Sequence, residues 1–357
     1  MRRLRIRTNQ KKTNAKLFTR KKSIVFFVFL IVCLVIIMVS LVVLDNLTVL
    51  VRGETVRSDD LPDALNGYTV LHVSDLHGQM TGTDHNTLFN AIKGRAYDAV
   101  LFTGDFTDKQ NDGAEQENAL ALTRRFAELK KPVYFVRGNH DPLVVLTDDN
   151  GVSYVNPFFN VLEEAGAVYV DAPVQVTQRE NGAVWLFPFE MLNLTRAQAQ
   201  TQLDALEGPQ ENVQQELSRS RFERLIGALD QMQPSDLIIG MTHYPLTPER
   251  VNDFLTRVPD GAQKLSELTV VLSGHYHGGQ IRVPLYGALY VPADTMGWRG
   301  FFPDNRYVRG LHLLENIVWQ NISGGLGSTG VGDTDFMRLR LFSTPEVSLI
   351  TFTNKAE

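Results

Sequence analysis

Five short apolar segments, each followed directly by a side chain that can bind a metal ion, constrain the fold of this chain more than any other feature. The segments are rich in residues typical of β-strands. They are Tyr68–Ser74, Ala99–Thr103, Val133–Val136, Leu237–Thr242 and Thr269–Ser273, followed by Asp75-Leu76-His77, Gly104-Asp105, Gly138-Asn139-His140-Asp141, His243 and Gly274-His275-Tyr276-His277. Ligands of open α/β sheets bind just past the carboxyl ends of the strands. We therefore expect an α/β fold in which these side chains share one rim.

The side chains at these strand ends form a set of oxygen and nitrogen donors without sulfur. Two carboxylates, four imidazoles and one amide are too many ligands for one ion, and they suit two divalent ions bridged by a carboxylate. Donors of this type favour Mn²⁺, Fe or Zn²⁺, and the sequence leaves the choice open. The chain has one cysteine, Cys33, which excludes an intramolecular disulfide and a zinc site built on several thiolates. The expected ligands are Asp75, His77, Asp105, Asn139, His243, His275 and His277.

Residues 23–44 form an uninterrupted apolar segment without a charged side chain. As a helix this segment spans ~33 Å, enough to cross the hydrocarbon core of a bilayer. The basic residues before it predict a cytoplasmic segment 1–22, a transmembrane helix 23–44 and an extracytoplasmic remainder. A cleaved signal peptide is the alternative, but the apolar segment is longer than is typical and no A-x-A-like site follows it.

The charge distribution argues against nucleic acid as a partner. Residues 1–22 carry ten Lys/Arg and no acidic residue, whereas the other 25 Lys/Arg and all 40 Asp/Glu follow residue 44. The portion after the apolar segment therefore has a net charge of −15. Nucleic-acid binding depends on neutralising phosphates with basic side chains, so we expect a membrane role for the basic N-terminus instead.

The remaining chain is expected to form one domain, residues 67–357, after a linker at 45–66 with one short strand at Thr48–Val51. Hydrophobic spacing predicts helices at Asn86–Lys93, Ala114–Lys131 and Pro157–Ala165. Segment 193–233 is rich in Gln, Glu and Ala and is expected to be a helical excursion of two helices. Thr195 is the predicted cap of the first, and Ser218 or Ser220 of the second.

The motifs D-L-H, G-D, G-N-H-D, an isolated H and G-H-Y-H, in this order over residues 67–283, resemble the calcineurin-like metallophosphoesterase superfamily. The segments S-G-H-Y-H-G-G-Q, G-G-L-G-S-T-G and P-E-V-S-L-I-T-F are similar, more narrowly, to bacterial membrane-associated phosphodiesterases such as UDP-2,3-diacylglucosamine pyrophosphohydrolase-like enzymes. The resemblance implies a β-sandwich of two mixed sheets flanked by helices, here preceded by one transmembrane helix.

The resemblance also assigns roles to residues. Asp75, His77 and His277 would hold one metal ion, Asn139, His243 and His275 the other, and Asp105 would bridge both. His140 would act near the leaving-group oxygen, with Asp141 orienting it. The implied activity is hydrolysis of a phosphodiester or pyrophosphate bond by metal-activated hydroxide, on a lipid or envelope substrate. A phosphomonoesterase and a non-catalytic, metal-retaining envelope binding protein are the alternatives.

Other polar and aromatic residues receive simpler interpretations. His72 and His312 are expected to be core histidines with satisfied hydrogen bonds. We expect His85 to lie in a solvated loop, and Asp108 and Asp112 to be surface or helix-cap residues. The loop Gly324–Gly332 could bind phosphate or a headgroup through its backbone amides, or could be a flexible glycine loop, and it is not included among the expected site residues. Trp298, Phe301 and Phe302 carry the hypothesis of an acyl-chain or membrane contact, with ordinary packing as the alternative.

Overall fold

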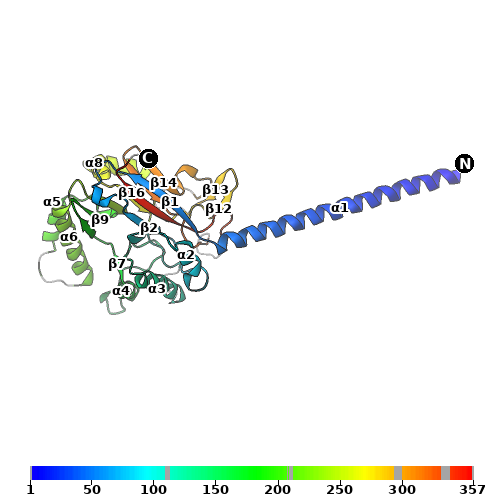
Figure 1. The fold of residues 1–357 in the computed structure, drawn as a ribbon. Coiled ribbons are helices and arrows are strands. Elements are labelled where there is room, and N and C mark those ends of the chain that lie inside the picture. The colour runs from blue at the N-terminus through cyan, green and yellow to red at the C-terminus, as the bar shows by residue number, and fades with distance from the viewer. Residues whose placement is uncertain are drawn as a thin grey trace.

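A computed structural model describes residues 2–108, 113–206, 208, 212–292, 300–330 and 338–355, with side chains from residue 21 onward. Two six-stranded sheets form its centre and a long helix leaves one side (Figure 1). Trp298 and Asp112 lie outside the described residues.

The first sheet is mixed and carries three of the five predicted strand ends. β2, β3, β4 and β7 run parallel to one another, and β16 joins β2 antiparallel. In spatial order its strands are β1 (Leu50–Arg57), β16 (Glu346–Thr353), β2 (Thr69–Val73), β3 (Ala99–Phe102), β4 (Val133–Phe135) and β7 (Ala167–Tyr169).

The second sheet is also mixed and carries the other two strand ends. Its four central strands are parallel and its edge strands are antiparallel to them. The order is β14 (Gly310–Leu314), β15 (Val318–Ile322), β11 (Val270–Ser273), β10 (Leu237–Met241), β9 (Gly182–Pro188) and β8 (Val174–Arg179). Two hairpins complete the strands: β5 (Val145–Thr147) with β6 (Ser153–Val155), and β12 (Ile281–Val283) with β13 (Gly287–Tyr290).

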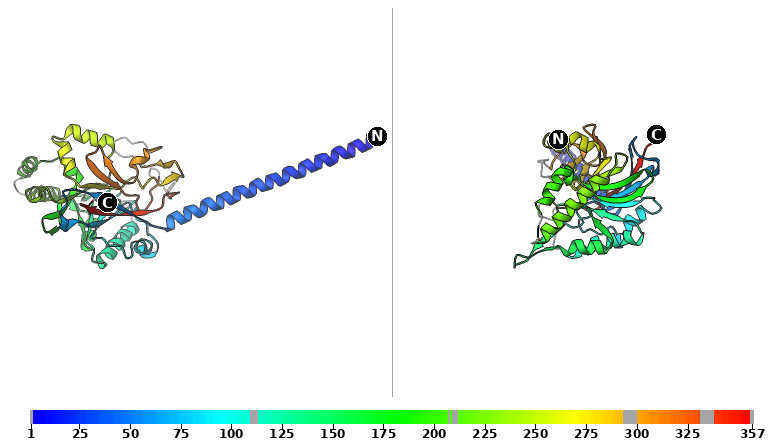
Figure 2. Two further views of the ribbon diagram at one scale, coloured as in Figure 1. Left: turned by 45° about the horizontal axis from the view of Figure 1, so that its top comes forward. Right: turned by 90° about the vertical axis from the view of Figure 1, so that its left-hand side faces the viewer.

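Side chains along each strand alternate between the two faces of its sheet, and this alternation produces the sandwich. In β2, Leu71 and Val73 pack toward helices while Val70 packs between the sheets, as a side-chain period of two requires. Helices α2 (Asn86–Ala91), α3 (Gly113–Glu128) and α4 (Pro157–Glu164) cover the first sheet. Helices α5 (Arg196–Asp204), α6 (Val213–Gln231), α7 (Pro248–Arg257) and α8 (Gly261–Ser266) cover the second (Figure 2). The expected β-sandwich of two mixed sheets with flanking helices is confirmed.

The expected linker at 45–66 needs correction. Residues Leu50–Arg57 form β1, which pairs in parallel with β16 along its whole length, from Leu50 opposite Glu346 to Arg57 opposite Thr353. The pairing was hidden because the partner strand lies at the other end of the sequence. β1 is thus an edge strand of the first sheet, and the domain begins before residue 67.

The predicted helical pair is present, although one cap differs. Thr195 accepts a hydrogen bond from the amide of Gln198, whose side chain bonds back to Thr195, forming a capping box. The second helix begins earlier than expected, because Asn212 caps it. Ser218 lies inside α6 and donates to the carbonyl of Gln214.

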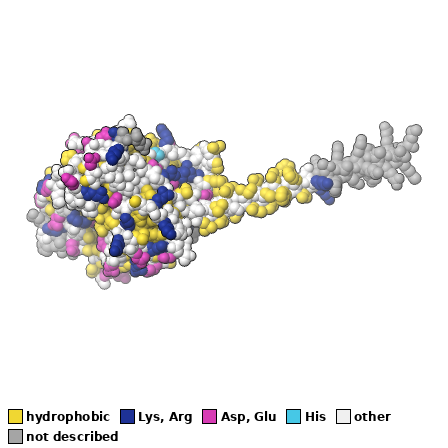
Figure 3. Space-filling model, in the orientation of Figure 1, with side chains coloured by type: hydrophobic (Ala, Val, Ile, Leu, Met, Phe, Trp, Pro, Cys, Tyr) yellow, Lys and Arg dark blue, Asp and Glu magenta, His cyan; other side chains and the backbone are white. Residues whose placement is uncertain are grey.

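The N-terminal helix α1 (Arg2–Leu47) contains one span, Lys21–Leu47, that is long and apolar enough to cross a membrane. None of the most apolar part of this span is buried against the domain, and Figure 3 shows its hydrophobic surface in the open. A signal sequence near an N-terminus can pass the same test of length and composition.

Candidate metal centre

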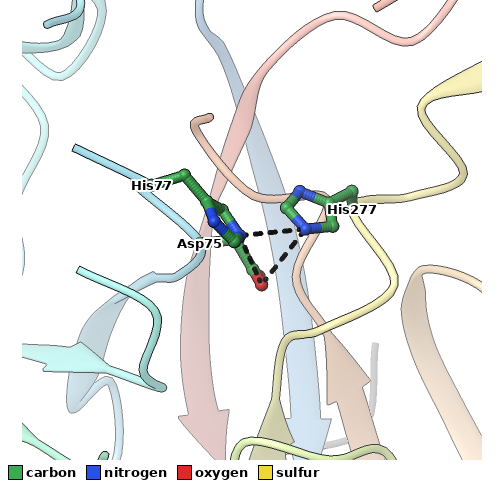
Figure 4. Close-up of side chains that lie close together, drawn as sticks. All are labelled: Asp75, His77 and His277. Carbon is green, nitrogen blue, oxygen red and sulfur yellow. Dashed lines mark hydrogen bonds and ion pairs between the residues drawn. The ribbon is translucent and has the colours of Figure 1, made fainter. Parts of the chain in front are cut away.

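The two sheets bring the predicted ligands together in two groups. In the first group, Asp75, His77 and His277 point toward one another (Figure 4). His77 Nε2 lies 3.1 Å from His277 Nε2, and Asp75 Oδ1 lies 3.7 Å from His277 Nε2. All three side chains are buried. Their donor atoms therefore converge on one small volume between the ends of β2 and β11.

The second group lies beside the first. Asn139 Oδ1 is 2.9 Å from His243 Nε2 and 3.0 Å from His275 Nδ1. The rings of His243 and His275 meet edge to face with centroids 5.1 Å apart. The three residues follow β4, β10 and β11, so both sheets contribute to this group as well.

Asp105 lies between the two groups. Its Oδ2 atom is 3.1 Å from His243 Nε2 and 3.5 Å from His77 Nε2. Among the described residues, this oxygen is one of few buried side-chain atoms without a hydrogen bond. A buried carboxylate oxygen with no donor is costly unless a cation neutralises it. The residues present thus fit divalent cations on both sides of Asp105.

In three of the four imidazoles, the ring nitrogen that faces away from the centre makes a hydrogen bond that orients the ring. The Nδ1 atom of His77 lies 2.9 Å from Asp108 Oδ1, that of His243 lies 2.8 Å from the carbonyl of Thr103, and that of His277 lies 3.3 Å from the carbonyl of Gly327. These partners accept, so each Nδ1 donates and leaves the Nε2 lone pair facing the centre. This is how metal-binding histidines are usually held.

Five of the expected ligands have left-handed backbone conformations, which are uncommon away from glycine. They are Asp75 (φ 53°), His77 (φ 48°), Asp105 (φ 58°), His275 (φ 68°) and His277 (φ 52°). Such conformations cost of order 1–3 kcal/mol each and persist where the surrounding structure enforces them. Five of the 15 non-glycine residues with positive φ in the described part of the chain are thus expected ligands gathered at one rim.

Two glycines allow the loops to approach each other closely. A Cβ atom on Gly138 would lie 2.1 Å from Asp105 Oδ1, and one on Gly274 would lie 2.5 Å from Asp75 Oδ2. Only glycine leaves room for these carboxylates. The glycines of the G-N-H-D and G-H-Y-H motifs therefore have a packing role at the centre itself.

The expectation that Asp141 orients His140 is wrong. The buried Asp141 carboxylate accepts hydrogen bonds from the amides of Asp105, Thr107 and Gly138, at 2.8, 3.1 and 2.9 Å. It joins two ligand loops and does not hold the ring of His140. His140 Nδ1 instead donates to the carbonyl of Asp108 at 3.0 Å, and its half-buried ring meets that of His77 edge to face.

Asp108 is the functional residue that the sequence interpretation missed. Its carboxylate accepts from His77 Nδ1 and from the hydroxyl of Thr329, and it lies 3.4 Å from an Arg338 nitrogen. Partial burial raises its pKa, but His77 and Arg338 outweigh this and lower it to about 2. The signal available in the sequence was a second carboxylate only three positions after Asp105.

The electrostatics of the centre also favour cations. Burial by itself would raise the pKa of Asp105, but the neighbouring His243 and His77 imidazoles hold it far below its usual range. Burial would lower the pKa of His243, yet Asp105 raises it to about 9. The buried negative charge of Asp105 thus favours a positive charge beside it, which a divalent cation can supply.

In the described part of the glycine-rich loop, four amides are hydrogen-bonded within the protein, among them those of Gly325 and Thr329, which donate to Ser323 Oγ and Gln280 Oε1. The amides of Leu326 and Gly327 donate to the carbonyls of Ser74 and Asp75, at 3.0 and 2.6 Å. This part of the loop therefore forms the wall behind the first ligand group. Residues 331 and 332 lie outside the described residues.

Comparison with known proteins agrees with this geometry. The family model for calcineurin-like phosphoesterases matches residues 68–279, and the chain belongs to this family. It is 26% identical over 309 residues to the metallophosphoesterase YkuE of Bacillus subtilis (strain 168), covering 83% of each chain. It is 23% identical over 295 residues to the metallophosphoesterase YkoQ of the same organism, covering 82% of this chain and 86% of YkoQ.

Among solved structures, the phosphopantetheinyl hydrolase PptH of Mycobacterium tuberculosis is similar, with 15% identity, a TM-score of 0.36, and coverage of 73% of this chain and 91% of PptH. The family membership identifies the chain as a metal-dependent phosphoric ester hydrolase.

Proposed function

We propose that the chain is a membrane-anchored phosphoesterase with two divalent metal ions that hydrolyses phosphodiester or pyrophosphate bonds. The observation that carries the proposal is the position of Asp105 Oδ2, which is buried, without a hydrogen bond, and between two groups of converging donor atoms. Asp75, His77 and His277 would hold one ion, and Asn139, His243 and His275 the other. Asp105 would contact both.

When bound, two such ions lower the pKa of a water molecule and stabilise the phosphoryl oxygens of the substrate. The chain itself orients the residues that would hold these ions. Asp141 holds the loops of Asp105 and Asn139 at a fixed spacing through three backbone amides. The Nδ1 atoms of His77, His243 and His277 are occupied by acceptors, so these rings present Nε2 to the centre.

His140 is the proposed general acid. Its Nδ1 donates to the carbonyl of Asp108, which fixes the ring, while its side chain keeps 31% of its surface exposed. The Nε2 atom is thereby directed away from Asp108 and is available to a substrate. Because Nδ1 keeps its own proton in the bond to Asp108, the acid would be the imidazolium: it would deliver its Nε2 proton to the leaving-group oxygen, avoid a free alkoxide and become neutral.

The location follows from the apolar helix. We place residues 1–22 in the cytoplasm, residues 23–44 in the bilayer and the catalytic domain outside, because the N-terminal flank is strongly basic. This arrangement, with the narrower resemblance to membrane-associated phosphodiesterases, supports a phosphate ester of a membrane lipid or envelope polymer as substrate.

The test uses the full chain purified in detergent, stripped with chelator and reloaded with Mn²⁺. Cleavage of bis-p-nitrophenyl phosphate and p-nitrophenyl phosphate is followed side by side, with and without EDTA. We expect metal-dependent cleavage that favours the diester, its loss in Asp105→Asn, and its retention in the exposed control Asp59→Asn. A preference for the monoester would identify a phosphomonoesterase, and two bound metals without turnover would identify a binding protein.

A further inference from the structure

A small three-stranded ribbon carries the most exposed apolar side chains of the described part of the domain. β12 and β13 form a hairpin, and the segment 300–302 adds to β13 through hydrogen bonds from Phe302 N to Leu289 O and from Val291 N to Gly300 O, at 2.8 and 2.7 Å. Leu285, at the tip, is fully exposed, and four neighbours are 40–67% exposed: Val283, Tyr286, Phe301 and Phe302. An exposed apolar group of this kind marks an interaction surface.

The ribbon is joined by hydrogen bonds to the end of α1. Asn46 bonds through its side chain to the backbone of Arg340, and Asp45 accepts from Phe342 N and from the hydroxyl of Thr344. Leu341 in turn exchanges backbone hydrogen bonds with the chain at β12, since Arg282 N donates to Leu341 O and Leu341 N to Gln280 O, both at 2.9 Å. Segment 340–342 is thus hydrogen-bonded both to the end of α1 and to the chain around β12, and it links the hairpin to the apolar helix.

The pictures show where this places the ribbon. β12 and β13 lie on the side of the domain from which α1 leaves, in both views that show this side (Figures 1 and 2). Figure 3 shows basic and hydrophobic side chains next to each other on the domain at the base of the helix. A bilayer that contains the apolar part of α1 would face this end of the domain.

Three arginines surround a single buried carboxylate at the same end. Arg52 Nη2 lies 2.9 Å and Arg309 Nη1 3.7 Å from Glu346 Oε2. Arg282, on β12, is close enough that Arg309 adds to the effect of burial in lowering its pKa to about 10, so it remains protonated at neutral pH. Glu346 and Glu54, which lies 4.0 Å from Arg52 Nε, together compensate two of the three positive charges. The remaining charge matches anionic headgroups.

We propose that this ribbon is a second membrane contact, with its apolar tip in the interface of an anionic bilayer and its arginines at the lipid phosphates. Apolar and aromatic side chains beside basic ones are typical of interfacial binding. The proposal rests on the proposed anchoring by α1 and does not depend on catalysis. It deepens the proposed function, because His277 precedes β12 by four positions on the same segment. The contact would hold the metal centre close to lipid headgroups that carry phosphate esters.

The experiment places a fluorescent label at the ribbon tip of the full chain. Cys33→Ser removes the single native thiol, and Leu285→Cys then provides a unique site for an environment-sensitive maleimide dye. The matched control is Val152→Cys, which is 60% exposed in the other hairpin, β5–β6. That hairpin packs on α6, on the side of the domain away from α1 (Figure 1). Both proteins are placed in nanodiscs, one chain per disc, with nitroxide groups on the upper acyl chain.

We expect nitroxide quenching at position 285 to be several-fold that at position 152, and to be greater in phosphatidylglycerol-containing discs than in purely zwitterionic ones. Equal quenching at the two positions would overturn the membrane contact, and equal quenching of position 285 in both bilayers would overturn the role of the arginines. A dye at position 285 that is shielded from water but not quenched by the lipid nitroxides would assign the ribbon to a protein partner instead. Hydrolysis of bis-p-nitrophenyl phosphate by the same discs reports separately on the catalytic proposal.

Discussion

Asp108 Oδ1 lies 2.9 Å from His77 Nδ1, and this contact decides which nitrogen of the ring faces Asp75 and Asp105. Because the pKa of Asp108 is lowered to about 2, its carboxylate is ionised at neutral pH and accepts the proton of Nδ1. The same residue offers its backbone carbonyl to His140. Asp108 therefore positions both a proposed metal ligand and the proposed general acid.

Replacing Asp108 should weaken metal binding without removing a direct ligand. In Asp108→Asn the ring of His77 keeps a neutral acceptor but loses the charge that raises its basicity, so we expect metal affinity to fall by roughly 10- to 100-fold. Titration of the stripped protein with Mn²⁺, followed by calorimetry, measures this. The control is Asp59→Asn, an exposed carboxylate paired with Arg57. Unchanged affinity in Asp108→Asn would contradict the positioning role.

His140 should matter for turnover and not for metal content. The structure allows a competing interpretation, because His140 also groups with His77 and Asp105 within metal-binding distance. For a general acid, His140→Ala should retain both metal ions while kcat falls by roughly 10²–10⁴. Metal analysis of the purified variant, paired with kinetics on bis-p-nitrophenyl phosphate, distinguishes the two roles. Loss of one equivalent of metal would make His140 a ligand.

Much of the centre follows from sequence because each part of it is local. A run of β-formers, a glycine and a donor side chain lie within ten positions of one another, and parallel pairing then places the ends together. The capping box at Thr195 is equally local, as it needs only the residue three positions later. Backbone sterics and short-range hydrogen bonds favour these features within short stretches of sequence.

Other features depend on contacts across the fold and were not predictable. β1 is a strand because β16 lies beside it, and His85 is buried because its ring reaches the carbonyl of Asn118. The solvated loop expected for His85 is therefore wrong. Asp141 was misassigned because adjacency in sequence to His140 does not bring its carboxylate to the ring. Three amides from two ligand loops donate hydrogen bonds to it instead.

Buried His72 predicts an acid-sensitive sandwich. It bridges the sheets, with Nδ1 2.8 Å from Asn321 Oδ1 and Nε2 2.9 Å from Thr103 Oγ1, which confirms the expected core histidine. Burial lowers its pKa from 6.5 to about 4. Below pH 6.5 the unfolded chain therefore binds a proton at His72, whereas the folded chain binds it only below about pH 4. The contribution of the neutral ring to the free energy of unfolding is fully present above pH 6.5. It is lost as the pH falls toward 4, by about 3 kcal/mol.

The variant His72→Gln tests this contribution, because an amide supplies one donor and one acceptor but does not titrate in this range. Thermal unfolding of both proteins in nanodiscs at pH 7.5 and pH 5 gives the comparison. We expect the variant to lose less of its melting temperature between the two pH values than the wild type, while His312→Gln, a half-buried control on β14, behaves like the wild type. An identical pH response in His72→Gln and the wild type would show that His72 contributes nothing to acid sensitivity.

Metal removal should destabilise the domain as well as inactivate it. A ligand that binds only the folded state at about 100 times its Kd stabilises that state by about 2.7 kcal/mol. Chelation also leaves Asp105 Oδ2 buried without a cation. We expect the stripped full chain to melt several degrees lower than the Mn²⁺-loaded chain and to recover on reloading. No difference in melting temperature would mean that the centre is too weakly populated to contribute to folding.

Arg340 should be the most sensitive position outside the ligands themselves. Its guanidinium is fully buried and donates to the carbonyls of Gly324, Gly327 and His277 at 2.8–3.1 Å. The carbonyl of Gly327 is also the acceptor for His277 Nδ1, so Arg340 holds the group that orients a first-group ligand. Hydrogen bonds from a charged group contribute about 1.5–3 kcal/mol each, so Arg340→Met should lower stability by several kcal/mol.

Arg340→Lys separates the loss of charge from the loss of geometry, because an ammonium keeps the charge but cannot span three carbonyls that a planar guanidinium reaches together. We expect Arg340→Lys to fold and to lose affinity for one of the two proposed metal ions, since His277 belongs to one ligand group. Arg306→Lys, in an exposed pair with Asp304, should bind both ions normally. Equal weakening of both ions in Arg340→Lys would mean that Arg340 supports the whole rim rather than the orientation of His277.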